Sequence, residues 1–185
     1  MKLPQKLTTR RLKIRPYRLY DLEAYLAFML DDEATRYLNL TDEQRTEEGA
    51  RRLFQLVLVS YSGEEPICAL VIACKKTDRF IGSCGLVPLE DGNAECYYTL
   101  LPQYQGQGYA TEAVRALLDY AFTKLELNEV TAYASEENEA SIQVALRLGM
   151  KDLGQQPYRE SGLTARMFSI ARRGRNRQKA RRNFS

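Results

Sequence analysis

Two glycines between an apolar strand and an amphipathic helix give the strongest chemical signal in this 185-residue chain. Glycine allows backbone conformations that other residues avoid, and it lets the backbone approach a ligand closely. The first amide N–H groups of a helix have no partners within the helix, so several of them can point at one anion. The order of strand, glycine loop and helix therefore predicts a phosphate site, formed by Gln105, Gly106, Gln107, Gly108, Tyr109, Ala110 and Thr111.

The spacing within the loop indicates which phosphate to expect. A nucleoside-triphosphate P-loop needs a Lys after its last Gly, but Tyr and Ala follow Gly108 here. A dinucleotide fingerprint needs a small residue at position 111, which is Thr here. It also needs an acidic residue about 20 positions after the loop, a spacing that Glu126 and Glu129 match only roughly. The order Gln-x-x-Gly-x-Ala, from Gln105 to Ala110, instead resembles the acetyl-CoA pyrophosphate loop of the GNAT N-acetyltransferases.

Two further blocks carry the same resemblance. Upstream, Thr9-Arg10-Arg11-Leu12-Lys13-Ile14-Arg15-Pro16-Tyr17 is similar to the opening of the RimJ/RimL branch of that family. Downstream, Asn138 and Ser141 match its Asn-x-x-Ser helix, and Leu148-Gly149-Met150 matches the end of that helix. The resemblance covers about residues 8–171. It implies a mixed, mostly antiparallel α/β sheet with helices on both faces and a splayed central strand pair.

The resemblance also assigns residues to the cofactor. In the family, the pantetheine arm of acetyl-CoA lies between two diverging strands, here expected at 94–101 and 129–135. It implies that Leu100 and Leu101 make main-chain contacts, one N–H polarising the thioester carbonyl, while the glycine loop holds the pyrophosphate. Asn138 would hydrogen-bond the pantetheine; the alternative is that it simply caps its helix.

The same resemblance also supplies candidates for proton transfer. The resemblance points to Glu95 as proton acceptor, because an amine arrives as ammonium and only its neutral form attacks. Alternatively, Glu95 binds a cationic acceptor or faces solvent. The family's usual acid, a Tyr four residues before Gly149, is Ala145 here. The thiolate then leaves unaided, or Ser141 assists it.

A second departure lies in the strand that carries Glu95. The branch often has Gly-Tyr-Trp there, whereas this chain has Tyr97-Tyr98-Thr99. The extra bulk of Tyr97 either narrows the acceptor pocket or reflects ordinary packing of strand aromatics.

Composition limits the chemistry further. The chain has no His, which excludes His-based catalytic triads and His-containing zinc sites, and we expect no metal. Four cysteines without CxxC spacing are expected to be reduced and buried. The chain lacks both an apolar run of about 18 residues and a signal-peptide pattern, so we expect a cytoplasmic protein without a membrane partner.

Charge divides the chain into an expected domain at 1–171 and a basic tail at 172–185. The tail carries seven of the 27 basic residues and no acid, which leaves 20 basic and 24 acidic residues in the remainder. The tail is either simply solvated or attracted to RNA or the ribosome.

The residue pattern also predicts the elements that must position these groups. Apolar and charged residues alternate in the strand at 12–15, the strand at 66–74 is strongly apolar, and apolar residues recur every three or four positions in the helices. The expected order is a strand at 12–15, helices from Asp21 and from Thr41, strands at 66–74, 80–87 and 94–101, a helix at 110–125, a strand at 129–135, a helix at 139–148, and strands at 151–155 and 163–171.

Together these observations predict an acetyl-CoA-dependent N-acetyltransferase. The acetyl group would pass directly to a primary amine, on a protein N-terminus or a small molecule. The sequence leaves open whether the protein is a monomer or a homodimer. A non-catalytic acyl-CoA-binding module and an RNA- or ribosome-associated protein acting through its basic tail are the alternatives.

Overall fold

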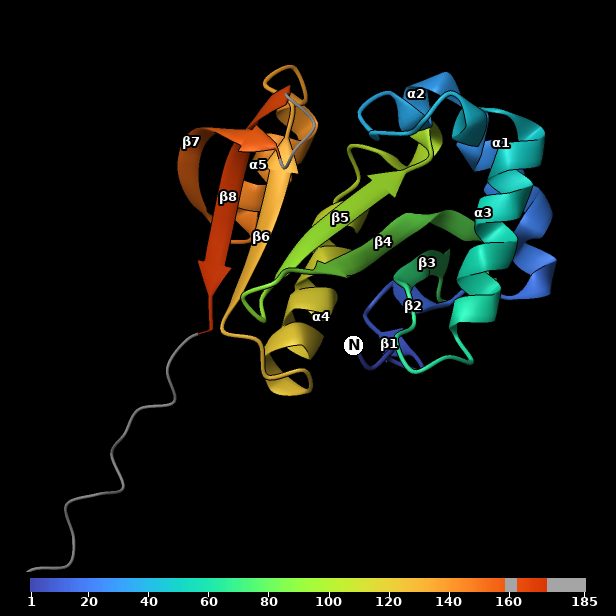
Figure 1. Cartoon of the computed structure of the whole chain (residues 1–185), viewed down its shortest axis with the longest axis horizontal. Coiled ribbons are helices and arrows are strands. Elements are labelled where there is room, and N and C mark those ends of the chain that lie inside the picture. Colours follow the sequence, from blue (N-terminus) through green and yellow to red (C-terminus); the bar gives the residue numbers. More distant parts are fainter. Residues whose placement is uncertain (159–162, 173–185) are drawn as a thin grey trace, which may run out of the picture.

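A computed structural model describes residues 1–158 and 163–172 (Figure 1). The predicted basic tail therefore lies outside the described residues except for Arg172. The helices and strands are β1 (Leu7–Thr8), β2 (Leu12–Pro16), α1 (Leu22–Met29), α2 (Asp32–Thr35), α3 (Glu47–Ser60), β3 (Cys68–Cys74), β4 (Phe80–Pro88), β5 (Ala94–Leu100), α4 (Tyr109–Thr123), β6 (Glu129–Ala134), α5 (Glu139–Arg147), β7 (Lys151–Tyr158) and β8 (Leu163–Ala171).

The eight strands form one sheet in the order β1-β2-β3-β4-β5-β6-β8-β7. Each neighbouring pair is antiparallel except β5 and β6, which are parallel. A parallel pair needs a crossover connection, and α4 supplies it. The mostly antiparallel mixed sheet confirms the predicted fold class.

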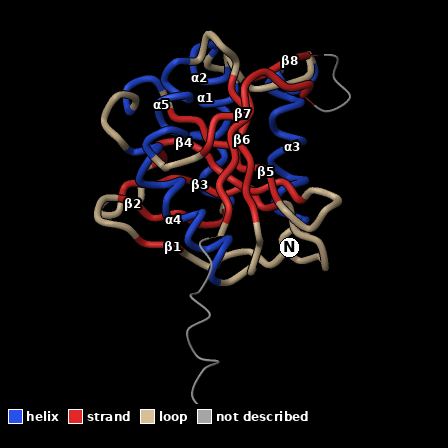
Figure 2. Tube along the Cα trace, turned by 90° about the vertical axis from the view of Figure 1, so that its left-hand side faces the viewer, coloured by secondary structure: helices blue, strands red, loops and turns tan. Residues whose placement is uncertain are grey.

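Helices cover both faces of this sheet. Helices α1 and α3 pack on one face with Val71 of β3, whereas α4 and α5 pack on the other with Leu70 and Ile72. Figure 2 shows α4 and α5 on one side of the strands and α3 on the other. Because both faces of β3 are covered, the strand is apolar along almost its whole length, as expected for a doubly buried strand.

The start of α3 differs from the prediction. Thr41 and Gln44 do begin a helical turn, because the Gln44 N–H donates to Thr41 Oγ1 and the Thr41 N–H to Gln44 Oε1. That turn is a short 3₁₀ helix, and the chain then becomes extended at Thr46. The Thr46 hydroxyl accepts from the Gly49 N–H and caps α3. Two N-cap signals in succession thus produce two elements where one helix was expected. The short elements β1 and α2 were not predicted.

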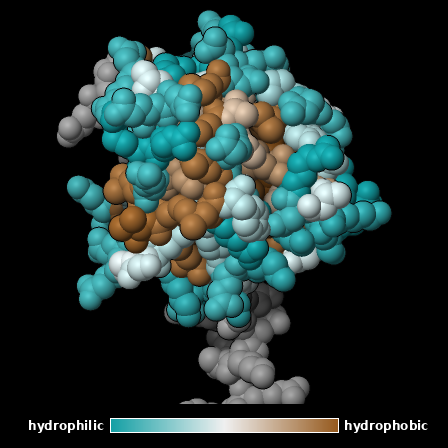
Figure 3. Space-filling model, turned by 90° about the vertical axis from the view of Figure 1, so that its right-hand side faces the viewer, coloured by the Kyte–Doolittle hydropathy of each residue, from teal (hydrophilic) through white to brown (hydrophobic). Residues whose placement is uncertain are grey.

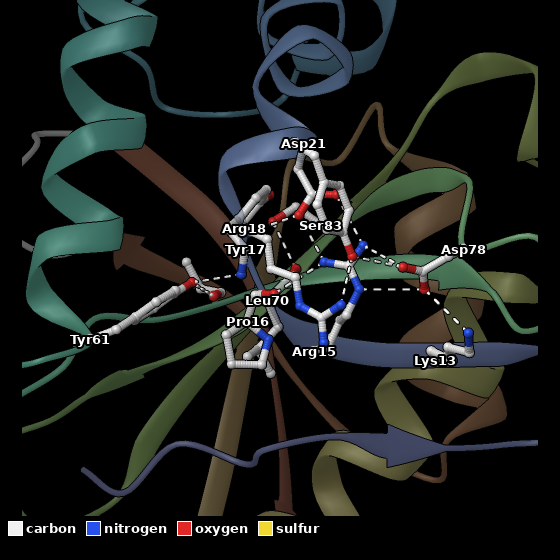
Figure 4. Close-up of polar contacts among 12 residues, drawn as sticks. Lys13, Arg15, Pro16, Tyr17, Arg18, Asp21, Tyr61, Leu70, Asp78 and Ser83 are labelled. Atoms are coloured by element: carbon white, nitrogen blue, oxygen red, sulfur yellow. Dashed lines mark hydrogen bonds and ion pairs between the residues drawn. The ribbon is translucent and has the colours of Figure 1, made fainter.

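A buried ion-pair network fixes α1 to the sheet (Figure 4). The Arg15 side chain on β2 is only 1% exposed, and its guanidinium donates to both carboxylate oxygens of Asp21, at 2.7 and 2.9 Å. Asp21 also accepts from the Arg18 N–H, and Asp78 in the β3–β4 turn accepts from Arg15 Nη2 at 3.1 Å. This network joins β2, the start of α1 and the β3–β4 turn.

The distribution of apolar side chains and cysteines completes the description of the fold. Hydrophobic side chains gather on the face that carries α1 and α3 (Figure 3), where α3 exposes Leu56 and Val59. Among the described residues, no helix has both the length and the apolar character needed to cross a bilayer. All four cysteines are free, and three are buried as predicted; Cys74 is half-buried.

Candidate active site

Strands β5 and β6 share only a short ladder. They pair through Ala94 with Val130 and Glu95 with Thr131, and then diverge (Figure 1). Beyond Glu95, no strand in the described part of the chain pairs with the edge of β5 that faces β6. The predicted splayed pair is therefore present, and its opening begins next to Glu95.

The hydrogen-bond pattern shows which amide groups of β5 face this opening. The Leu101 N–H donates to the carbonyl of Ile81 at 3.0 Å. Backbone groups alternate in direction along an antiparallel strand, so the N–H groups of Tyr97 and Thr99 also face β4. Those of Cys96, Tyr98 and Leu100 face the opening. Of the two residues predicted to contact the cofactor through the main chain, Leu100 presents its N–H to the opening, whereas the Leu101 N–H is used within the sheet.

The glycine loop leaves a row of amide groups without acceptors. Gly106 and Gly108 have φ values of +70° and +76°. A Cβ at Gly106 would meet no atom within 4 Å, so the backbone conformation is what requires glycine. Among the described residues, none of the six N–H groups from Gly106 to Thr111 donates to a protein acceptor. The Thr111 hydroxyl is also buried, and no residue that the structure describes hydrogen-bonds to it.

The two glutamines of the loop brace it from within. Gln105 Nε2 donates to the carbonyl of Leu100 at 3.1 Å, and Gln107 Nε2 donates to the carbonyl of Gln103 at 2.9 Å. The loop is therefore held by its own polar side chains. Its unpaired groups are backbone amides at the positive end of α4, which includes Tyr109 and Ala110 in its first turn.

Asn138 and Ser141 lie at the start of α5, as predicted. The Asn138 side-chain oxygen accepts from the Ser141 N–H at 3.0 Å, so Asn138 does cap the helix. Its amide nitrogen has no protein partner among the described residues. The Ser141 hydroxyl donates to the Tyr98 hydroxyl, which in turn donates to the Ser141 carbonyl, both at 3.0 Å. Burial is the main reason that the pKa of Tyr98 lies above its ordinary value.

Glu95 lies where the opening begins, on the sheet face opposite to the one that carries the Cys96 and Tyr98 side chains. Cys96 and Tyr98 pack with the core on the α4 and α5 side, and Tyr97 packs with the core on the α1 and α3 side. Side chains alternate along a strand, so Glu95 lies on the face of Tyr97. Glu95 is only 6% exposed, and its carboxylate accepts from the Tyr158 hydroxyl at 3.2 Å.

Residues that the sequence did not indicate surround this carboxylate. Thr131 is buried opposite Glu95, and its hydroxyl has no partner among the described residues. The ring of Tyr158 lies edge-on to that of Tyr133, with centroids 5.0 Å apart. Tyr158 ends a strand that was expected to stop at Gln155, so no periodic signal indicated it.

The structure favours the packing interpretation of Tyr97. Its ring lies against Gly85 of the neighbouring strand, where a Cβ would be 2.5 Å from a Tyr97 ring carbon. Burial raises the pKa of Tyr97 above its ordinary value. Tyr97 is half-buried against the core on the α1 and α3 side, and a glycine accommodates its extra bulk there.

Comparisons with known proteins agree with this geometry. A family model for the acetyltransferase (GNAT) domain matches residues 11–151. The chain is 34% identical over 153 residues to an uncharacterized N-acetyltransferase, p20 of Bacillus licheniformis. This match covers 81% of this chain and 84% of p20. It is also 36% identical over 87 residues to the spermidine N(1)-acetyltransferase of Escherichia coli K12, a match that covers 42% of this chain and 47% of that enzyme.

Solved structures share the fold. A GNAT-family acetyltransferase from Bacillus anthracis superposes with a TM-score of 0.77 at 21% identity, covering 90% of this chain and 98% of that one. RimL, a ribosomal L7/L12 α-N-protein acetyltransferase in complex with coenzyme A, superposes with a TM-score of 0.75 at 18% identity, covering 90% and 97% of the two chains.

Proposed function

The chain belongs to the GNAT family of N-acetyltransferases, and on that premise we propose that it transfers an acetyl group from acetyl-CoA directly to a primary amine. The acceptor is a protein N-terminal α-amine or a small-molecule amine. No covalent intermediate on the protein is required. The buried thiol nearest to Glu95 agrees with this, because burial raises the pKa of Cys96 to about 12 and keeps it protonated.

One observation carries this proposal: the six unpaired amide groups from Gly106 to Thr111. Unpaired backbone N–H groups are costly unless water or a ligand satisfies them. Here they are consecutive, they lie at the positive end of a 15-residue helix, and they adjoin the opening between β5 and β6. This arrangement suits an anion joined to an extended arm, as in the diphosphate and pantetheine of coenzyme A.

The amide groups along β5 suit the reacting end of such a ligand. The N–H groups of Tyr98 and Leu100 face the opening and can donate to a thioester carbonyl. A preorganised donor of this kind typically contributes about 10²- to 10³-fold to the rate. The amide nitrogen of Asn138 can donate to the same extended arm.

Glu95 supplies the proton acceptor in this proposal. It lies at the start of the opening and on the face opposite the glycine loop, so an amine and the thioester approach from different sides. Its carboxylate is held by Tyr158, and the unpaired hydroxyl of Thr131 lies beside it. The Ser141 hydroxyl, which donates to the Tyr98 hydroxyl in this structure, is the candidate proton source for the leaving thiolate on the other side.

Release of free thiol from acetyl-CoA tests the proposal. We expect release to depend on added amine, and a panel should include peptide N-termini, ribosomal proteins and polyamines, with mass detection of the acetylated product. The polyamine is included because of the spermidine N(1)-acetyltransferase relative, and the ribosomal proteins because of the RimL neighbour. Tight coenzyme A binding without amine-dependent thiol release across the panel would instead indicate a non-catalytic acyl-CoA-binding module.

A further inference from the structure

We propose that Arg11, from the turn between β1 and β2, is a positioning residue of the diphosphate site, acting by neutralising Glu112. The inference rests on the proposed use of coenzyme A. It concerns a charge that the glycine-loop motif does not contain, because the predicted loop has only uncharged side chains.

Glu112 lies in the first turn of α4, at the same helix end that would receive the diphosphate. Both of its carboxylate oxygens are engaged. One accepts from the Thr9 hydroxyl at 2.6 Å and from the Arg11 N–H at 2.8 Å, and the other accepts from Arg11 Nε at 2.6 Å. Burial raises the pKa of Glu112, but the hydrogen bonds from Thr9 and Arg11 outweigh it and hold the pKa below its ordinary value. The carboxylate is therefore ionised at neutral pH.

Arg11 also reaches the glycine loop itself. Its Nη1 donates to the carbonyl of Gln107 at 3.0 Å, and its guanidinium lies 4.2 Å from the centroid of the Tyr109 ring. A Cβ on Gly108 would lie 3.6 Å from Nη2. One guanidinium thus contacts the loop and the carboxylate together, although 101 residues separate Arg11 from Glu112 in the sequence.

Without this cation, Glu112 would oppose the ligand. Thr9, Gly108 and Glu112 line the same groove of about 550 Å³ beside α4, so a diphosphate on the loop would share solvent space with the carboxylate. Arg115, Asp119 and Arg147 line this groove as well, but no ion pair joins Arg115 or Arg147 to Glu112 among the described residues, whereas Arg11 is paired with it. Like charges within about 8 Å of each other are only partly screened at physiological salt. By pairing with Glu112, Arg11 leaves the helix end and its unpaired amide groups free to act on the ligand.

Calorimetric titration with coenzyme A tests this inference through a double-mutant cycle. We expect Arg11→Ala to weaken coenzyme A binding about 10- to 100-fold, because the unpaired Glu112 carboxylate would then repel the diphosphate in a partly solvated site. Glu112→Gln alone should leave affinity within about threefold, and the double variant Arg11→Ala/Glu112→Gln should recover most of the loss. Arg52→Ala, which removes an exposed charge on α3, is the matched control and should bind as the wild type does.

Two further measurements separate this role from a merely structural one. S-acetylpantetheine lacks the diphosphate, so its turnover should be the same in wild type and Arg11→Ala. If Arg11→Ala does not fold, Arg11→Gln removes the same charge while keeping most of the side chain, and the cycle is repeated with it.

The outcomes are distinct. Wild-type affinity in Arg11→Ala, or a double variant as weak as Arg11→Ala, would overturn the inference and leave the proposed function intact. A wild-type protein that does not bind coenzyme A would overturn the proposed function and this inference with it.

Discussion

Replacing Glu95 with Gln is expected to lower kcat/KM for the amine acceptor about 10²- to 10⁴-fold, the range typical for losing a general base. Glutamine keeps the size of the side chain and an oxygen for the Tyr158 hydroxyl, but it cannot take a proton from an ammonium group. Affinity for coenzyme A should not change, because the unpaired amide groups lie on β5 and at the start of α4. Steady-state kinetics with both substrates, together with calorimetry for coenzyme A, measure these effects.

The matched control is Glu23→Gln, which removes an exposed carboxylate on α1. It should retain wild-type kinetics. If Glu95→Gln instead raised KM for the amine and left kcat unchanged, Glu95 would bind a cationic acceptor and would not act as the base. Retention of full activity would exclude both roles.

Replacing Arg15 with Ala is expected to lower the free energy of unfolding by about 3–5 kcal/mol. The change removes both hydrogen bonds to Asp21 and leaves this 3%-exposed carboxylate without its cation. It also leaves a cavity beneath α1. This is a large share of the roughly 5–15 kcal/mol by which a domain is usually stable. Urea unfolding at pH 7, followed by circular dichroism, measures the loss.

Acidification provides a second measure of the same network. Burial raises the pKa of Asp78, but hydrogen bonds from Arg15 and Tyr20 bring it below its ordinary value. A carboxylate with a lowered pKa stabilises the fold at neutral pH, and this contribution is lost as the pH falls through its folded-state pKa. The stability difference between wild type and Arg15→Ala should therefore narrow below about pH 4.

The control for the unfolding measurement at pH 7 is Arg52→Ala, which removes an exposed charge on α3. Its free energy of unfolding should fall by less than about 1 kcal/mol. An equal loss of stability in Arg15→Ala and Arg52→Ala would contradict the account.

The sequence predicted most of the fold, because its signals are local and periodic. Short apolar runs bounded by turn residues located β3 to β6, and the helical period located α4 within two residues at each end. Elements defined by hydrogen bonds rather than by period were missed: α2 is a single turn, and the 3₁₀ turn before α3 depends on two competing caps. The end of β7 was set too early, because Gly154 and Pro157 interrupt its pattern.

The candidate site was predicted unevenly for a similar reason. The glycine loop and the Asn138 cap follow from short motifs, and the structure places them beside the opening between β5 and β6. The direction of a backbone N–H follows from strand register, which the sequence does not reveal, so Leu100 and Leu101 were not distinguished. Contacts across the fold, such as Arg11 with Glu112, Tyr98 with Ser141 and Tyr158 with Glu95, join segments that no local pattern relates.

Amide chemical shifts recorded by NMR during titration with coenzyme A test the central claim most directly. We predict that the largest changes occur at the six amide groups from Gly106 to Thr111 and at those of Cys96, Tyr98 and Leu100. The Leu101 amide, which donates to Ile81, should change less than the Leu100 amide. Unchanged shifts at these positions with millimolar coenzyme A, or changes confined to another face of the protein, would contradict the account.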